Sequence, residues 1–310
     1  MRNRTPGALL VVVFFLAAAA RGPQSSPGHA GAVRTQMHNV VYHFTANIVV
    51  HIEDLAGELV PTATAPLPIF DDKNSFVLTI TAAEIEIGEQ SLANALNSFV
   101  FSAKDAPLKE VSIRIENDQL KIRGKLHNKG DIEFESVGHL SVTGDGRVRL
   151  HAEKIRAFDL PVKGLMDLLG VKVADLIKTG KAHGVSAEKD DLIIDANEIL
   201  PPPHIEGRLT AVRLRGHSIV EVFGDPGKHP WVHIPARNYM AYRGNRLRFG
   251  KLTMDDTDMV LIDMDPNDPF DFFLDGYIDQ LVAGYTKNTR DNGLRVFMRD
   301  YNKLRPATPR

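Results

Sequence analysis

Residues 108–127 read LKEVSIRIENDQLKIRGKLH, and this stretch carries the pattern on which most of the chain is built. Apolar residues occupy alternate positions on both sides of a polar turn at Asn117-Asp118. The alternating residues are Val111, Ile113, Ile115, Leu120, Ile122 and Leu126. A period of two broken by a short polar turn predicts an antiparallel hairpin with one apolar and one charged face.

The same alternation continues in both directions from this hairpin. Further strands are expected over 132–142 and 147–158, around a hairpin at Lys189-Asp190, and over 208–224. Before the hairpin, we expect a strand over 75–88 and one long strand over Val40–Ile52, with a proline-containing connection at 60–74. After Gly224 a proline-rich linker leads into a further hairpin and strand, a helix over Asp275–Tyr285 and a last strand within 293–301.

Two segments interrupt the strands with helical spacing. Residues 89–101, EQSLANALNSFVF, place apolar side chains at i, i+3, i+4, i+7 and i+8, which predicts an amphipathic helix. These residues are Leu92, Ala95, Leu96, Phe99 and Val100. Residues 157–171, AFDLPVKGLMDLLGV, predict a second short helix over 161–169 with a wide apolar face. That face either covers the protein's own core or contacts a ligand, and the spacing alone leaves both readings open.

The first residues resemble a secretory signal peptide. Arg2 and Arg4 precede an apolar run at 8–20 that ends in small residues, and the run is short for a membrane span. An uncleaved membrane anchor is the alternative. We expect a cleaved signal peptide at 1–20, a flexible leader at 21–37 and a periplasmic or secreted protein. The chain contains no cysteine, so its fold must rely on core burial without disulfides.

Composition and motifs argue against several classes of function. Lys and Arg number 37 against 39 Asp and Glu, so no basic surplus favours nucleic acid as a partner. The sequence GHSIV at 216–220 lacks the second glycine of a nucleophile elbow. Asp263, Asp265 and Asn267 begin like a calcium loop, but Asp268 and Leu274 stand where glycine and glutamate are required. We therefore expect no enzyme activity, no cofactor, no metal site and no nucleic-acid partner.

The pattern as a whole predicts an α+β fold. One-sided apolar strands form a highly twisted antiparallel sheet, and two or three amphipathic helices segregate to one face of it. Such short helices each cover a strip only about 10 Å wide. Part of the apolar face must therefore curl onto itself, be covered by the C-terminal segment, or remain available to a ligand.

The order of elements over residues 76–224 resembles the bacterial LmeA-type phospholipid-binding family, a member of the TULIP superfamily of tubular lipid-binding proteins. The resemblance rests on LTITAAEIEIGEQSLANALN at 78–97, PLKEVSIRIENDQLKIRGKL at 107–126, LSVTGDGRVRLHAEKI at 140–155, FDLPVKGLMDLLG at 158–170 and LIIDANEILPPPHIEGRLTAVRLRGHSIV at 192–220. It implies a TULIP-like domain at 38–224, with the sheet wrapped around one or two helices, and leaves a C-terminal α+β extension of unknown role at 225–310.

The resemblance also implies a ligand and a site. The expected ligand is a phospholipid or another acyl lipid, held in an apolar groove between the sheet and the helices at 91–101 and 161–169. Peripheral contact with a membrane is a further expectation. The residues expected to line the groove are Leu92, Leu96, Phe99, Ile113, Ile115, Leu165, Leu168 and Leu169.

Two other classes of function compete with this hypothesis. One is a periplasmic or cell-surface scaffold with a self-covered sheet and no ligand, in which the acidic C-terminal part binds a partner. The other is a hydrolase, which the missing motifs disfavour.

Overall fold

A computed structural model describes residues 29–104, 106, 108–127, 131–157, 184–188 and 191–304. Strands dominate this part of the chain, and the few helices are short, so the fold is a sheet-dominated α+β fold. The expected signal peptide at 1–20 and the expected helix at 161–169 lie outside the described residues. None of the helices in the described ranges combines the length and the apolarity needed to cross a bilayer.

The larger sheet has nine strands in one continuous path. Their order is β11 (Leu209–Arg215), β12 (Ser218–Phe223), β3 (Phe76–Gly88), β2 (Ile48–Pro61), β1 (Val33–Thr45), β13 (Tyr239–Gly244), β16 (Thr257–Asp263), β19 (Leu294–Met298) and β18 (Tyr285–Asn288). Two more strands join the same sheet beside this path. They are β10 (His204–Glu206), parallel to β3, and β17 (Phe270–Phe273), parallel to β1.

The second sheet is an antiparallel meander. Its order is β4 (Leu108–Glu116), β5 (Gln119–His127), β6 (Asp131–Val142), β7 (Val148–Ala157), β9 (Asp191–Ile194) and β8 (Val185–Glu188). The strands predicted around Asn117-Asp118 and the hairpin predicted around Lys189-Asp190 are thereby confirmed. A small hairpin of β14 (Leu247–Phe249) and β15 (Leu252–Met254) forms the third sheet.

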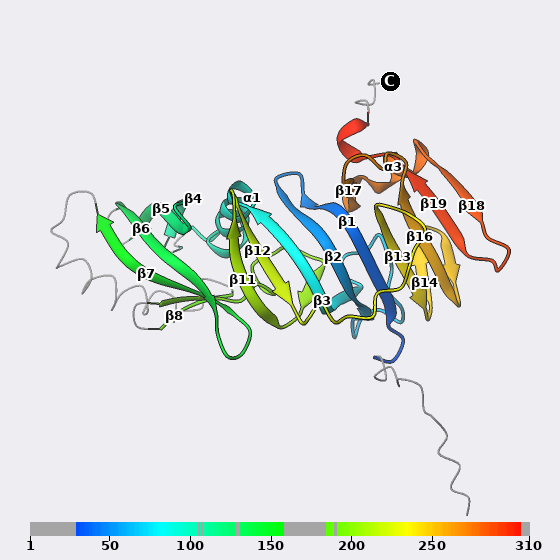
Figure 1. Cartoon of the computed structure of the whole chain (residues 1–310), viewed down its shortest axis with the longest axis horizontal. Helices are drawn as coiled ribbons and strands as arrows, with labels where there is room; N and C mark the ends of the chain where they lie inside the picture. Colours follow the sequence, from blue (N-terminus) through cyan, green and yellow to red (C-terminus); the bar gives the residue numbers. More distant parts are fainter. Residues whose placement is uncertain are drawn as a thin grey trace, which may run out of the picture.

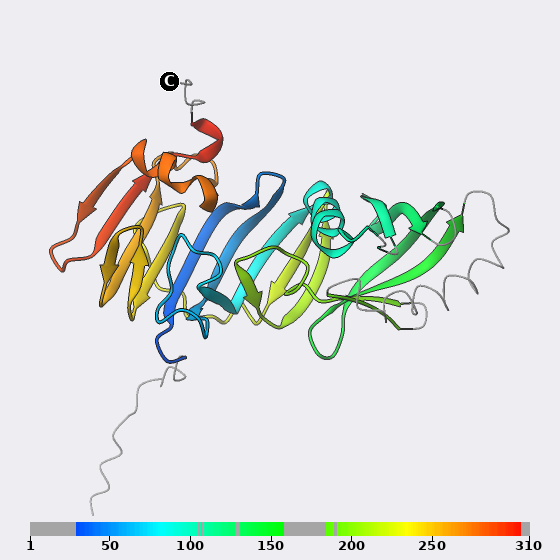
Figure 2. The same ribbon diagram turned by 180° about the vertical axis from the view of Figure 1, so that it is seen from behind.

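The two large sheets lie end to end along the long axis of the molecule, with α1 (Glu89–Ala95) between them (Figure 1). The view from behind shows the same arrangement (Figure 2). A short π-helix, η1 (Leu96–Val100), continues α1, so the helix predicted at 89–101 is present. Among the described residues, the remaining helices are η2 (Leu274–Gly276), α3 (Tyr277–Val282) and η3 (Tyr301–Lys303), all in the C-terminal part.

Side chains of α1 and η1 supply hydrogen bonds to the edge of β4. The Asn97 amide accepts a hydrogen bond from the backbone N–H of Val111 at 2.8 Å and donates one to the Val111 carbonyl at 2.7 Å. Glu89 accepts the backbone N–H of Ile115 at 2.6 Å. The helix thus takes the place of a neighbouring strand, because buried backbone groups need a partner. One apolar cluster consequently runs through both sheets.

The prediction of a single strand over Val40–Ile52 is wrong. The chain turns back at Ala46 and Asn47, and β1 pairs with β2. The backbone N–H groups of Asn47 and Ile48 both donate to the Thr45 hydroxyl, which stabilises the turn. Because the turn is two residues long, apolar residues continue to alternate across it. The sequence pattern therefore does not show where β1 ends and β2 begins.

The borders expected from the sequence also differ from those of the sheets. β1 begins at Val33, so residues 33–37 belong to the first sheet rather than to the expected leader. β13 pairs with β1 and β16 with β13. The residues after Gly224 therefore extend the same sheet, and Gly224 is not a border between sheets.

The strands β2 and β3 approach closely at Gly57. The register between them shifts there, and a Cβ atom placed on Gly57 would lie 2.4 Å from the Thr79 carbonyl oxygen. The distance is far shorter than any normal contact, and the obstacle is backbone, so only glycine fits.

We expect Gly57→Ala to lower the free energy of unfolding by about 1–3 kcal/mol, as forced overpacking does. The urea midpoint of the purified protein measures this change. Gly144→Ala is the matched control, because nothing lies within 4 Å of a Cβ atom there. Equal midpoints for the two variants would contradict the close approach.

Candidate functional site

An apolar cavity lies on the concave side of the first sheet. Its cavity volume is about 60 Å³, smaller than the range of about 300–1,000 Å³ typical of small-molecule sites. A single water needs about 10–15 Å³ by that measure, so the cavity is narrow and suits a slender ligand.

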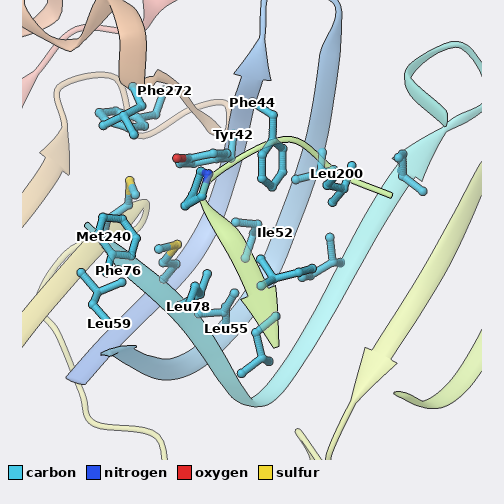
Figure 3. A pocket seen from close by; sticks show the side chains of 18 of the residues that line it. Tyr42, Phe44, Ile52, Leu55, Leu59, Phe76, Leu78, Leu200, Met240 and Phe272 are labelled. Atoms are coloured by element: carbon cyan, nitrogen blue, oxygen red, sulfur yellow. The ribbon is translucent and has the colours of Figure 1, made fainter. Parts of the chain in front are cut away.

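Apolar side chains from β1, β2 and β3 form the floor of the cavity (Figure 3). These residues are Met37, Tyr42, Phe44, Val50, Ile52, Leu55, Leu59, Phe76, Leu78, Ile80, Ile85 and Ile87. They stand on one face because alternate residues of a strand point the same way. Met240 and Tyr242 of β13 extend the floor towards the C-terminal strands.

Segments from distant parts of the chain cover this floor. The connection before β10 contributes Ala196, Ile199, Leu200 and Pro203, and β10 itself contributes Ile205. From the other side come Phe272 of β17 and Leu274 of η2, with Phe70 from the loop after β2. The close-up shows Phe272 and Leu200 on opposite sides of Tyr42 and Phe44, which both belong to β1 (Figure 3).

One carboxyl group, that of Glu221 on β12, borders this apolar space. Among the described residues, none forms a hydrogen bond or an ion pair with it. Desolvation by the surrounding apolar atoms raises the pKa of Glu221 to about 7. Burial also raises the pKa of Tyr42 and of Tyr242, so both phenols stay neutral at pH 7. Glu221 is therefore the described lining residue that titrates near neutral pH.

Five of the eight residues that the sequence predicted for the groove belong to the described part of the chain. Leu92, Leu96, Ile113 and Ile115 are buried in the apolar cluster, where α1 and η1 run beside β4. Phe99 is 37% exposed on η1. These five do not line the cavity, and Leu165, Leu168 and Leu169 lie outside the described residues.

Sequence reasoning missed the lining of β1–β3 and the carboxyl group of Glu221 on β12. A signal for Glu221 exists in the sequence SIVEVF at 218–223. Ile219 and Phe223 are buried and alternate with Glu221, so all three side chains point to the same face of β12. A charged residue therefore stands among apolar residues on that face. The segments that cover the floor carry no such signal, because their position depends on pairing between distant strands.

The acidic C-terminal cluster has a cation of its own. Asp265, Asp268 and Asp300 bring carboxylate oxygens within 4.8 Å of one another, a spacing that could hold a metal ion. The ammonium group of Lys303 lies 2.8 Å, 2.7 Å and 2.9 Å from these three residues. Asp263 lies beside this cluster and accepts hydrogen bonds from the Asn238 amide at 2.8 Å and from the backbone N–H of Asp265 at 2.7 Å. The lysine offsets one of the three negative charges of the cluster.

The raised pKa of Glu221 makes the free energy of unfolding depend on pH, and the direction of this dependence follows from the shift. Because the pKa of about 7 in the folded state exceeds the ordinary value of 4.5 for a glutamate, the folded state binds more protons between these pH values. Stability contributed by the protonated group is present below about pH 4.5 and is lost as the pH rises through 7. We expect Glu221→Gln to match the wild type at pH 4 and to exceed it at pH 8.5 by on the order of 2–3 kcal/mol.

Urea unfolding at a series of pH values measures this difference. Glu206→Gln serves as control, since this exposed residue of β10 changes the net charge equally. A constant difference between Glu221→Gln and wild type across the pH range would contradict the assignment.

Comparison of this chain with models of protein families, with curated proteins and with solved structures finds no match in any of the three.

Proposed function

We propose that this chain is an exported, non-enzymatic lipid-binding or lipid-transfer protein with a TULIP-like fold. The observation that carries the proposal is the apolar cavity between the floor of β1–β3 and the covering segments at 196–205 and 272–274. The resemblance of residues 76–224 to phospholipid-binding proteins and the signal-like first residues support it. The ligand is an acyl lipid, and the narrow cavity favours one acyl chain over two.

Apolar burial alone supplies the binding energy that such a ligand needs. Each methylene removed from water contributes about 0.8 kcal/mol, so ten methylenes give about 8 kcal/mol before the cost of association is subtracted. The polar head group then stays at the open mouth of the cavity. No catalytic group is required for this activity.

The proposal is tested first on wild-type protein purified after export and without detergent. We expect native and denaturing mass spectrometry to find phospholipid at close to one molecule per chain. A protein that carries no lipid, and takes up none from phosphatidylglycerol and phosphatidylethanolamine vesicles, would overturn the proposal.

Two variants locate the ligand. Ala196→Phe adds a ring to a buried residue of the lining, so we expect it to lose most of the lipid. Phe99→Ser is the matched control, because the residue is exposed and outside the cavity, and we expect it to keep its lipid. Thermal unfolding confirms that both variants are folded. The reverse result would place the lipid beside α1 and β4, where the sequence predicted it.

A second candidate function is a scaffold that binds a partner through its C-terminal part. Exposed apolar side chains favour it: Ile278 is 58% exposed and Val282 79% exposed on α3, and Tyr285 of β18 is 43% exposed. Contiguous apolar surface of this kind is typical of interaction sites. This function is preferred if the wild-type protein neither carries nor takes up lipid.

A further inference from the structure

Glu221 occupies a position that the pattern of the sheet assigns to an apolar side chain. On β12 it alternates with Ile219, 4% exposed, and Phe223, fully buried. Its partner in register on β3 is Ile85, which also lines the cavity, and its partner on β11 is Val212. The carboxyl group thus points to the same side of the sheet as the lining of the cavity.

Other acidic residues of this region have their own cations on the opposite face. Glu84 accepts a hydrogen bond from the Arg213 guanidinium at 2.6 Å, and Glu86 accepts one from Arg215 at 3.1 Å. Both arginines are at odd-numbered positions of β11, so their side chains point to the face opposite to that of Val212. These cations are therefore engaged elsewhere and do not reach Glu221.

The cavity itself offers no cation to this carboxyl group. The described lining residues include the neutral phenols of Tyr42 and Tyr242 but no lysine, arginine or histidine. Glu221 is only half-buried, so solvent can reach its carboxyl group until a ligand fills the cavity. A carboxyl group left without a partner in apolar surroundings is then costly, whether charged or neutral. A donor must come from outside the chain if this group is to be satisfied in the ligand-filled cavity.

We propose that Glu221 is the specificity-determining residue of the cavity, and that it selects apolar ligands carrying a hydrogen-bond donor, a hydroxyl or an amine, over ligands that end in a carboxylate. The proposal rests on the proposed function, because it requires an apolar ligand in this cavity. A hydroxyl can bond to either protonation state of the carboxyl group. An ammonium group pairs best with the ionised form.

The pH dependence follows from these charges. With a pKa of about 7, Glu221 ionises between pH 5.5 and 8.5. An alkylamine stays protonated over this range, so its affinity rises with pH. An alkanoate is negatively charged over the same range, so its affinity falls as a second negative charge appears beside it. The lining tyrosines do not titrate in this interval.

The test uses four ligands with the same ten-carbon chain and different ends. Decan-1-ol can donate and accept hydrogen bonds, whereas decyl methyl ether can only accept them. Decylamine is cationic and decanoate is anionic. Equilibrium dialysis below the concentration of micelle formation, with ligand quantified by mass spectrometry, gives each affinity at pH 5.5 and 8.5. The proteins are the wild type, Glu221→Leu, Glu221→Gln and the control Glu206→Gln.

For the wild type we expect decan-1-ol to bind about five- to tenfold more tightly than the ether, the ratio typical of one hydrogen bond. At pH 8.5 decylamine should bind at least about tenfold more tightly than decanoate. Glu221→Leu should lose both preferences and bind the ether at least as well as the alcohol. Glu221→Gln should lose the pH dependence and most of the alcohol preference, because its amide N–H can donate to the ether oxygen, and Glu206→Gln should behave as wild type.

Two results overturn the inference and leave the proposed function standing. One is binding of all four ligands without preference by the wild type, and the other is the same preference in wild type and Glu221→Leu. If no ten-carbon ligand binds to any of the proteins, the proposed function fails, and the inference fails with it.

Discussion

The structure depends on two long strands that each change their hydrogen-bonding partner part of the way along. β1 pairs with β13 through His38 and with β17 from Val40 onwards. β3 pairs with β10 through Thr79 and with β12 from Ala83 onwards. Since one edge of a strand can bond to one neighbour at a time, each change splits the sheet into two layers at that point. β10 and β17 are thereby placed over the concave face.

Nearby side chains and a close backbone approach stabilise the two points at which β1 and β3 change their hydrogen-bonding partner. In β1 the change falls at Asn39, whose φ of 53° is left-handed, a conformation that asparagine tolerates better than most residues. Its side chain donates to Asn238 at 2.7 Å and contacts the His51 ring nitrogen at 2.9 Å. In β3 the change falls beside Thr81, where Gly224 lets the backbones approach so closely that a Cβ atom would lie 2.1 Å from the Thr81 carbonyl oxygen. The cavity therefore owes its cover to backbone geometry as much as to apolar side chains.

The sequence predicted the elements that form from neighbouring residues. These elements are the second sheet, the helix at 89–100 and α3. Each is specified by the spacing of apolar residues and by turn residues that lie within a few positions of one another in the sequence. Sequence periodicity could not reveal the turn at Ala46-Asn47, because the apolar parity continues across it. Nor could it place β13 beside β1, or the segment at 196–205 over β3, because pairing between distant strands leaves no local trace. The groove was consequently predicted beside the helix that follows β3 in the sequence. The cavity is covered by segments that are distant in sequence from the strands of its floor.

The position of β1 within the sheet has a consequence for the order of folding. β1 is an interior strand, flanked by β2 and by β13, which comes from the opposite end of the chain. Until residues 239–244 have been synthesised, the outer edge of β1 has no partner and stays open to wrong pairing. Contacts so distant in sequence form slowly, because a long loop must close first. The chain therefore completes its first sheet only after nearly all of it has emerged from the ribosome.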